Sequence, residues 1–320
     1  MGRYVVTGGV GFIGYHTTRA LLAAGHSVVV VDDLSDAPYP KAEKERNLRD
    51  LRDAYGAVEL VQACVTDRAA LAAAFAGADR LIHLAGLAGV RPSFRDPARY
   101  VRVNVEGTAT VLELAIEHGV SRVVFASSSS VYGNSTPLPA HEDAPAIVPE
   151  SPYAASKRSA ELVARAILLR APTVSCAALR FFTVYGPRQR PDMAIHKFIR
   201  AIDRGEPVIL RGDGATSRDY TYVDDIINGT VAAIERDTPG FRAYNLGGCH
   251  ATRLDDLVAR IGAALGKTPR VELVSEMLGD VQHTLASVAR AHAELGYDPQ
   301  VGLDEGLRRF VAWHRARPEH

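Results

Sequence analysis

Two side chains in the segment SPYAASK (151–157) could transfer a proton. Tyr153 and Lys157 are four residues apart, a spacing that places both on one face of a helix. An ammonium beside a phenol favours the phenolate and lowers the phenol pKa from about 10 towards neutrality. A tyrosine and a lysine also meet at this spacing by chance on many helices. The pair is therefore predicted to be reactive only where its neighbours form a binding site.

Four consecutive serines in SSSSVYG (127–133) supply such a neighbour. They follow VSRVVFA (120–126), an apolar run typical of a buried strand. We expect Ser127 mainly to pack at the end of this strand. The hydroxyls that follow are expected at the carboxyl edge of the sheet, where open α/β sheets bind their ligands.

A glycine-rich loop, TGGVGFIG (7–14), stands between an apolar strand and a helix at the start of the chain. Gly8, Gly11 and Gly14 would allow a tight turn and a close backbone approach to a pyrophosphate at the helix N-terminus. The next strand ends in Asp32 and Asp33, whose carboxylates can bind an adenosine ribose and would repel a 2′-phosphate. The pattern predicts NAD rather than NADP; a tight turn that binds nothing is the alternative.

Strands and helices that would position these residues alternate through the first half of the chain. Apolar runs rich in Val and Ile are separated by helical patterns, which predicts βαβ units and a buried parallel sheet. The expected strands are 3–8, 27–33, 58–63, 80–86, 121–127 and 173–182. The charged segment 41–54 is expected to be a solvated helix face. After about residue 185 the pattern changes, which predicts a smaller domain over the carboxyl edge of the sheet.

Composition narrows the possible partners and compartment. Among 320 residues, Lys+Arg and Asp+Glu both number 37, so we expect no nucleic acid and no anionic membrane surface as partner. No secretory signal is recognised, and no apolar run approaches the ~20 residues of a spanning helix. Cys64, Cys176 and Cys249 are odd in number and far apart. They predict reduced thiols, no metal site and a cytoplasmic location.

Seven motifs, taken in order, resemble those of the extended short-chain dehydrogenase/reductases and span nearly the whole chain. They are TGGVGFIG (7–14), HLAG (83–86), NVEGT (104–108), SSSSVYG (127–133), YAASK (153–157), RFFTVYGP (180–187) and SRDYTYVDD (217–225).

The resemblance implies an α/β fold of two domains. A Rossmann-type doubly wound parallel sheet in residues 1–182, to which segment 219–248 returns, would bind NAD. A smaller C-terminal α/β substrate domain in residues 183–320 would bind a UDP-sugar. It also implies a homodimer packed through two helices of each subunit, near residues 105–118 and 153–170.

By the same resemblance, Tyr153 is the catalytic acid and base, and Lys157 tunes it and holds the nicotinamide ribose. Ser128 hydrogen-bonds the reacting sugar oxygen. The resemblance implies further NAD contacts at Phe12, Ile13, Cys64, Val65, Leu84, Ala85, Gly86, Asn104, Ala126 and Phe181.

Two of the serines bear on the type of reaction. Family members that dehydrate a sugar carry an Asp-Glu pair before Val-Tyr-Gly, and those that decarboxylate UDP-glucuronate usually carry a Glu. Here these positions hold Ser129 and Ser130. Without a carboxylate to remove the proton from carbon five, the reaction would stop at the 4-ketone, which favours a 4-epimerase.

The segment TVYGPRQRPDM (183–193) resembles that of UDP-glucuronate 4-epimerases, where a Thr and an Arg receive the sugar carboxylate. Thr183 replaces the Asn of UDP-galactose epimerases, and Arg188 and Arg190 follow. A guanidinium matches a carboxylate bidentately, and we prefer Arg190 for this role, with Arg188 meeting solvent or the other subunit instead. A surface loop of unpaired arginines is the alternative. The remaining substrate contacts implied are Val90, Arg91, Ser129, Ser130, Met193, Arg218 and Asp280.

Some positions depart from the family pattern. Ala63 and Cys64 replace a Gly-Asp pair, so the backbone near Val65 would hold adenine, and Met277 replaces a phosphate-binding arginine. Ala88 stands in place of a lysine. Three other functions remain as alternatives: a UDP-glucose or UDP-N-acetylglucosamine 4-epimerase, a UDP-glucuronate decarboxylase, and a non-catalytic NAD-sensing module. The retained serine, tyrosine and lysine disfavour the last.

Overall fold

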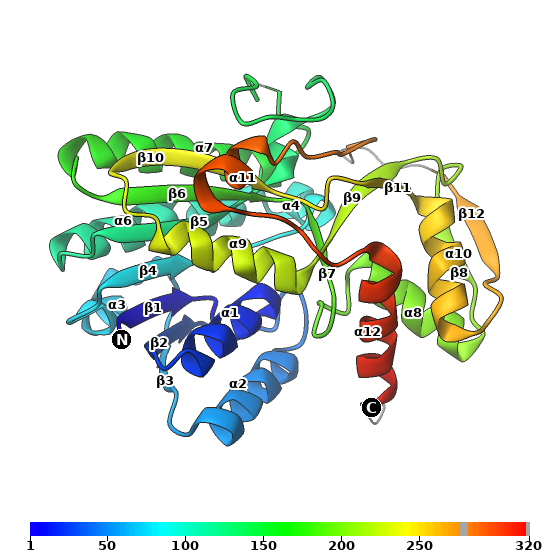
Figure 1. Cartoon of the computed structure of the whole chain (residues 1–320), viewed down its shortest axis with the longest axis horizontal. Coiled ribbons are helices and arrows are strands. Elements are labelled where there is room, and N and C mark those ends of the chain that lie inside the picture. Colours follow the sequence, from blue (N-terminus) through cyan, green and yellow to red (C-terminus); the bar gives the residue numbers. More distant parts are fainter. Residues whose placement is uncertain (147, 276–280, 318–320) are drawn as a thin grey trace.

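A seven-stranded sheet forms the centre of the protein. The computed structural model describes residues 1–146, 148–275 and 281–317. The strands lie in the order β10-β6-β5-β4-β1-β2-β3, and all their pairings are parallel (Figure 1). Their bounds are β1 Arg3–Thr7, β2 Ser27–Asp32, β3 Glu59–Gln62, β4 Arg80–His83, β5 Arg122–Ser128, β6 Ser175–Phe181 and β10 Gly240–Leu246. The predicted fold class is confirmed.

Helices cover both faces of this sheet because alternate strand residues point to opposite sides. Tyr4 and Val6 of β1 belong to a core shared with α1, α2 and α9, whereas Val5 belongs to a core shared with α6 and α7. The helices are α1 Phe12–Ala23, α2 Lys41–Tyr55, α3 Arg68–Leu71, α6 Gly107–Glu117, α7 Pro152–Ile167 and α9 Val223–Glu235.

Short helical segments connect the longer elements. They are η1 Ala72–Phe75, α4 Val90–Arg95, α5 Pro97–Val101, the π-helical turn η2 Arg102–Glu106, η3 Ser129–Tyr132 and η4 Leu168–Arg170. The helix expected near residues 105–118 is therefore preceded by a wider turn, which contains Asn104.

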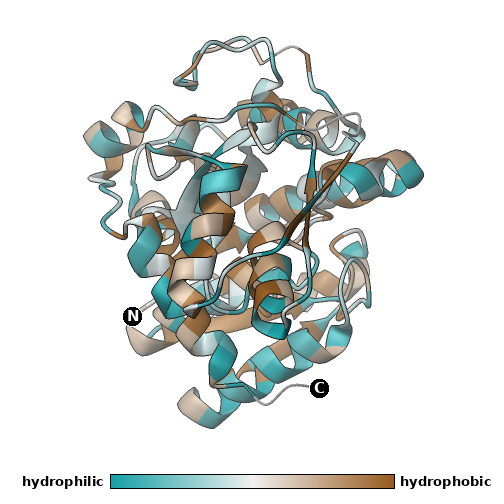
Figure 2. Cartoon of the chain, turned by 90° about the vertical axis from the view of Figure 1, so that its right-hand side faces the viewer, coloured by the Kyte–Doolittle hydropathy of each residue, from teal (hydrophilic) through white to brown (hydrophobic). Residues whose placement is uncertain are grey.

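The C-terminal elements form a smaller unit beside the sheet (Figure 1). Three strands pair as β11-β9-β7 and two as β12-β8. The elements are β7 Thr183–Tyr185, α8 Ala194–Arg204, β8 Val208–Arg211, β9 Ser217–Tyr222, β11 Ala251–Arg253, α10 Leu254–Leu265, β12 Val271–Val274 and α12 Leu303–Arg315. The remaining helix, α11 Ala289–Leu295, packs instead against β10 and α9 of the large sheet. In α12, Leu307 and Phe310 are buried and Arg308 is exposed. Figure 2 shows the same alternation in the colours of the helices, which have hydrophobic residues (brown) and hydrophilic residues (teal) along one helix.

One expectation about the surface is wrong. The charged segment 41–54 was expected to face solvent, but α2 buries Lys44, Asn47, Leu48 and Leu51. The polar members of this face have partners in other elements, described below. Within the described residues, every helix is too short or too polar to cross a membrane.

Candidate active site

A cavity of about 580 Å³ lies at the carboxyl ends of the parallel strands. Its wall combines the glycine-rich loop, the end of β2, the serine run and the beginning of α7 with the segment that follows β6. This is the edge at which open α/β sheets bind ligands, and the volume suits a small molecule or cofactor.

Most of the residues predicted for the site line this one cavity. They are Gly8, Gly11, Phe12, Ile13, Gly14, Asp32, Asp33, Cys64, Val65, Leu84, Ala85, Gly86, Val90, Arg91, Ala126, Ser128, Ser129, Ser130, Tyr153, Lys157, Phe181, Thr183, Arg190 and Met193. Asn104, Arg188 and Arg218 do not line it. Asp280, like Met277, lies outside the described residues.

The glycine-rich loop has the close packing that a dinucleotide turn requires. Gly8 has φ +68°, and a Cβ there would approach the backbone nitrogen of Ala85 to 2.7 Å. A Cβ on Gly14 would overlap the carbonyl oxygen of Gly8, so α1 can pack on the strand only through glycine. The first turn of α1 holds no acidic residue, which leaves its positive end available to a pyrophosphate. The loop therefore fits NAD.

The adenosine end of the cavity holds a cation that the sequence analysis assigned to solvent. The Lys44 ammonium lies 3.7 Å from an Asp32 oxygen and 3.6 Å from an Asp33 oxygen. It also donates to the carbonyl oxygen of Ser35 at 3.1 Å. Burial raises the pKa of Asp32, and the charge of Lys44 opposes this rise. Lys44 thus favours the charged form of a buried carboxyl group where a ribose would bind.

Tyr153, Ser128 and Lys157 meet in the same cavity. Ser151 caps α7 by accepting from the N–H of Ala154 at 3.2 Å, which places Tyr153 in the first turn. Burial raises the pKa of Tyr153, opposed by a hydrogen bond with Ser128 and by the charge of Arg190. The Lys157 ammonium instead donates to the carbonyl oxygen of Ala126 at 2.8 Å. That Lys157 tunes the phenol therefore stays a prediction.

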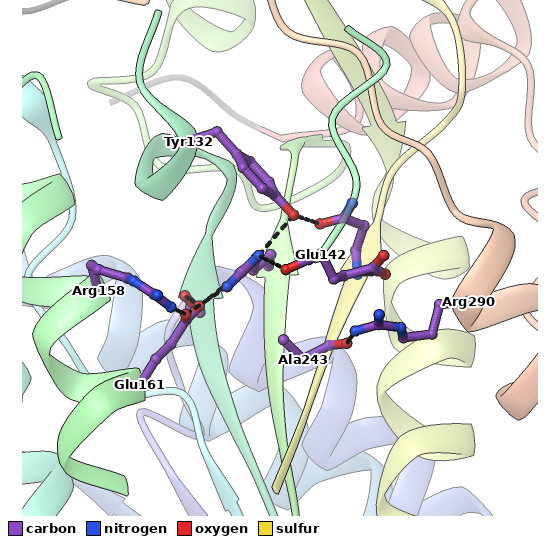
Figure 3. Close-up of polar contacts among 9 residues, drawn as sticks. Tyr132, Glu142, Arg158, Glu161, Ala243 and Arg290 are labelled. Carbon is purple, nitrogen blue, oxygen red and sulfur yellow. Dashed lines mark hydrogen bonds and ion pairs between the residues drawn. The ribbon is translucent and has the colours of Figure 1, made fainter. Parts of the chain in front are cut away.

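A buried ion pair joins α7 to β6 one turn beyond Lys157 (Figure 3). Glu161, one turn after Lys157, accepts from Arg180 at 2.9 and 2.8 Å and from Arg158 at 2.8 Å. Burial lowers the pKa of Lys157 to about 8, and the charge of Glu161 opposes this effect. Ser127 was expected mainly to pack, but its hydroxyl donates to Glu161 at 2.6 Å.

The same ion pair fixes the segment that follows the serines. Arg180 donates to the Tyr132 hydroxyl at 2.9 Å, and this hydroxyl donates to Asn245 of β10 at 2.7 Å. The backbone N–H of Asn245 donates to Glu142 at 2.9 Å. The Arg180 nitrogen that contacts Tyr132 also donates to the carbonyl oxygen of Glu142 at 3.2 Å (Figure 3). The serine run is therefore anchored at both ends.

Asn104 was expected to contact NAD, but it is 1% exposed and lies behind the cavity wall. Its side chain accepts from the N–H of Leu87 at 2.8 Å and donates to the carbonyl oxygen of Leu87 and to Ser156, both at 2.9 Å. Asn104 therefore ties the loop after β4 to the catalytic helix. Its residue type gave no indication of this indirect role.

Of the four arginines predicted for substrate, Arg91 and Arg190 line the cavity and the other two do not. Arg190 lines the cavity and pairs with Asp192, with Nε–Oδ1 and Nη2–Oδ2 distances of 2.9 and 2.6 Å. Arg188 is bound instead to Asn47 and Asp50 of α2, both at 2.6 Å. Arg188 therefore does not reach the cavity wall, which differs from the prediction that it contacts substrate. Arg218 donates to the carbonyl oxygens of Ser217 and Gln282, both at 3.0 Å, and is not in the cavity wall.

Several lining residues were not predicted. Tyr39 and Asp192 contribute polar groups to the wall, and Arg190 lies over the Tyr39 ring at 5.7 Å. Asp192 lies in the same RPDM segment as Arg190 and Met193. A carboxylate two residues after a predicted site arginine could have indicated that the two side chains pair. The described residues contain no group of three or more His, Cys, Asp and Glu side chains that could hold a metal ion.

The parallel sheet, the glycine turn and the buried tyrosine–lysine pair define a dinucleotide-binding enzyme. The model of the NAD dependent epimerase/dehydratase family matches residues 4–247. The chain is 37% identical over 322 residues to UDP-glucuronate 4-epimerase of Thermodesulfobacterium geofontis, an alignment that covers 100% of this chain and 98% of that protein.

Two solved structures have folds similar to that of this chain. UDP-glucuronic acid 4-epimerase from Bacillus cereus, in complex with UDP-glucuronic acid and NAD, has a TM-score of 0.91 and 32% identity, covering 98% of this chain and 99% of that one. DesIV, a dTDP-glucose 4,6-dehydratase from Streptomyces venezuelae with NAD and TYD bound, has a TM-score of 0.90 and 33% identity, covering 98% and 97%.

The chain therefore belongs to the NAD-dependent epimerase/dehydratase family. It is a nucleotide-sugar enzyme of this family, and its cofactor is NAD. Both the resemblance and the cofactor predicted from the sequence are confirmed.

Proposed function

We propose that this enzyme is a UDP-glucuronate 4-epimerase, which interconverts UDP-glucuronate and UDP-galacturonate through a 4-keto sugar. The observation that carries the proposal is the position of Arg190. Its guanidinium lines the same cavity as Tyr153, and its charge acts on the pKa of that phenol. A cation within reach of the reacting group can bind a carboxylate on the neighbouring carbon of the sugar ring.

The side chains in the cavity match the steps of such a reaction. NAD held at the glycine-rich loop would supply the hydride acceptor for carbon four and the hydride donor for the return step. Tyr153 takes the proton from the 4-hydroxyl, and Ser128, hydrogen-bonded to Tyr153, holds the same oxygen. After the flat ketone has turned over, Tyr153 returns the proton. The Lys157 ammonium, held by Ala126, provides a positive charge near the phenol and the ribose.

The cavity provides little to drive elimination. Among the described residues that line it, the acidic ones are Asp32, Asp33 and Asp192; the first two lie beside Lys44, and the third is paired with Arg190. Ser129 and Ser130 occupy the positions where a carboxylate would act on carbon five. This supports an epimerase over a dehydratase.

Holding the carboxylate also protects the intermediate. The 4-keto form of a uronic acid is a β-keto acid, which loses carbon dioxide fastest when the breaking bond stands perpendicular to the ketone plane. Asp192 engages the Nε and Nη2 edge of Arg190, and Thr183 lies in the same wall. A guanidinium fixed in this way would hold the carboxylate in one orientation. Arg190 and Thr183 would thereby suppress decarboxylation.

The test is a panel of UDP-glucuronate, UDP-glucose and UDP-N-acetylglucosamine, with products identified by NMR. We expect turnover of UDP-glucuronate to its 4-epimer. Arg190→Ala and Thr183→Ala should lower this turnover and raise the share of UDP-pentose. Preferred turnover of a neutral sugar, or a pentose as the main product of the unchanged enzyme, would contradict the proposal. So would variants that leave both rate and product ratio unchanged.

We also propose a homodimer packed through α6 and α7. Leu162 of α7 is 52% exposed and Leu169 of the following turn is 83% exposed, which leaves apolar surface on this side of the protein. Light scattering should give twice the mass of one chain, and Leu162→Glu should shift the protein towards the mass of one chain. A monomeric parent protein would refute this part of the proposal.

A further inference from the structure

Arg188 joins the loop that carries Arg190 to the dinucleotide end of the protein. Its Nη1 donates to Asn47 and its Nη2 to Asp50, both at 2.6 Å, and its guanidinium lies over the ring of Tyr15 at 3.9 Å. Its side chain is 15% exposed, and its backbone has φ +67°, a conformation that is unfavourable for a residue with a side chain. Three partners hold the residue in this conformation.

All three partners belong to the elements around the NAD loop. The Asn47 amide is 4% exposed, and while its oxygen accepts from Arg188, its nitrogen donates to the carbonyl oxygen of Val10 at 2.9 Å. Val10 lies between two of the turn's glycines, and Tyr15 is in the first turns of α1. One buried amide therefore bridges the glycine-rich loop and the loop between β7 and α8 (186–193), which carries Arg188 and Arg190 and is called the substrate loop.

Hydrogen bonds also fix the residues of the substrate loop on either side of Arg188. His16 of α1 contacts the carbonyl oxygen of Pro187 through Nε2 at 2.9 Å. Burial lowers the pKa of His16 to about 4, so the ring is neutral and Nε2 carries the donated hydrogen. Gln189 donates to the carbonyl oxygen of Val184 at 2.9 Å. Arg190 thus emerges from a loop whose preceding residues are fixed.

We propose that Arg188 is a positioning residue that couples NAD binding at the glycine-rich loop to sugar binding by Arg190. The inference rests on the proposed function, because it assigns Arg190 to the sugar. A dinucleotide that orders the glycine-rich loop would also order Asn47 through Val10, and Asn47 would hold Arg188 and the loop behind Arg190. By thermodynamic reciprocity, the sugar nucleotide would raise the affinity for NAD by the same factor.

The test measures the coupling directly by calorimetry. The full chain in a Tyr153→Phe background, which prevents conversion, is titrated with UDP-glucuronate in the absence and in the presence of saturating NAD. The ratio of the two dissociation constants is expected to be at least about fivefold, and Arg188→Ala should lower it by at least about threefold. The affinity without NAD should change by less than about twofold. A merely structural role would weaken both affinities alike.

Asn47→Ala should give the same loss, and the double variant should lose no more than either single one. Arg260→Ala, which removes an exposed arginine paired with Asp256 and Asp304, is the matched control and should leave the coupling unchanged. Should Arg188→Ala fail to fold, Asp50→Asn removes the negative charge of one partner at a half-exposed site and should lower the ratio in the same direction.

Unchanged coupling in Arg188→Ala or Asp50→Asn, or a parent protein without coupling, would overturn the inference. Repeating the titrations with UDP-glucose separates it from the proposed function. If the enzyme prefers this neutral sugar, the assignment as a uronate epimerase fails. The coupling ratio with UDP-glucose then still decides the role of Arg188.

Discussion

Replacing Glu161 by Gln should destabilise the protein strongly, because it leaves a buried cation without its counter-charge. The side chains of Glu161 and Arg180 are 1% and 3% exposed, and they share two hydrogen bonds. Removing one partner of such a pair costs about 3–5 kcal/mol. Gln keeps the volume and one acceptor, so we expect about 3 kcal/mol, measured as the loss in the free energy of unfolding in urea.

Two further variants test whether the loss of stability comes from burying an unpaired charge and not simply from breaking an ion pair. Glu113→Gln breaks contacts with Arg68 and Arg170 at the surface, where the Glu113 side chain is 43% exposed, and should cost less than about 1 kcal/mol. Replacing both buried partners, as Glu161→Leu with Arg180→Met, should cost less than Glu161→Gln alone, because no unpaired charge remains. A loss for Glu161→Gln no larger than for Glu113→Gln would refute the reasoning.

Three further predictions concern the cavity. Tyr153→Phe should lower the turnover rate by about 10²–10⁴ while UDP-sugar affinity is kept, because only the acid–base group is removed; near-normal turnover would contradict its role. Lys44→Met should raise the dissociation constant for NAD about tenfold, since Asp32 loses its buried counter-charge, and calorimetry giving the parental value would count against this. The pKa of Lys157 is lowered from 10.5 to about 8, so the folded protein binds fewer protons than the unfolded one between these values. In NAD-free protein its contribution to stability should therefore rise with pH across this window, and the slope should be larger than in Lys157→Met; equal slopes would contradict the assignment.

The parallel sheet could be predicted from the sequence because its signals are local. Apolar runs rich in Val mark the strands, and each predicted strand overlaps an observed one, from β1 to β6. The glycine-rich loop and Tyr153 were found for the same reason: a short motif contains all the residues that define them. These motifs lie at strand ends, and parallel pairing brings the strand ends together.

The missed features depend on partners far away in the chain. Lys44 and Asn47 are polar and lie in a charged segment, so no local pattern indicates that they are buried. Their partners Asp32, Val10 and Arg188 come from three other segments, the last 141 residues from Asn47. Ser127 likewise gained its role from Glu161, 34 residues later. Such long-range hydrogen bonds require the tertiary structure.

The most direct test of the central claim is to incubate the enzyme with UDP-glucuronate in deuterated water and follow the product by NMR. If the hydride leaves carbon four and returns to its other face, the product is UDP-galacturonate with protium, not deuterium, at carbon four. Loss of carbon dioxide would instead leave an enol that takes up solvent deuterium at carbon five and yields a UDP-pentose. The account predicts the protiated 4-epimer as the main product, and a deuterated pentose as the main product would contradict it.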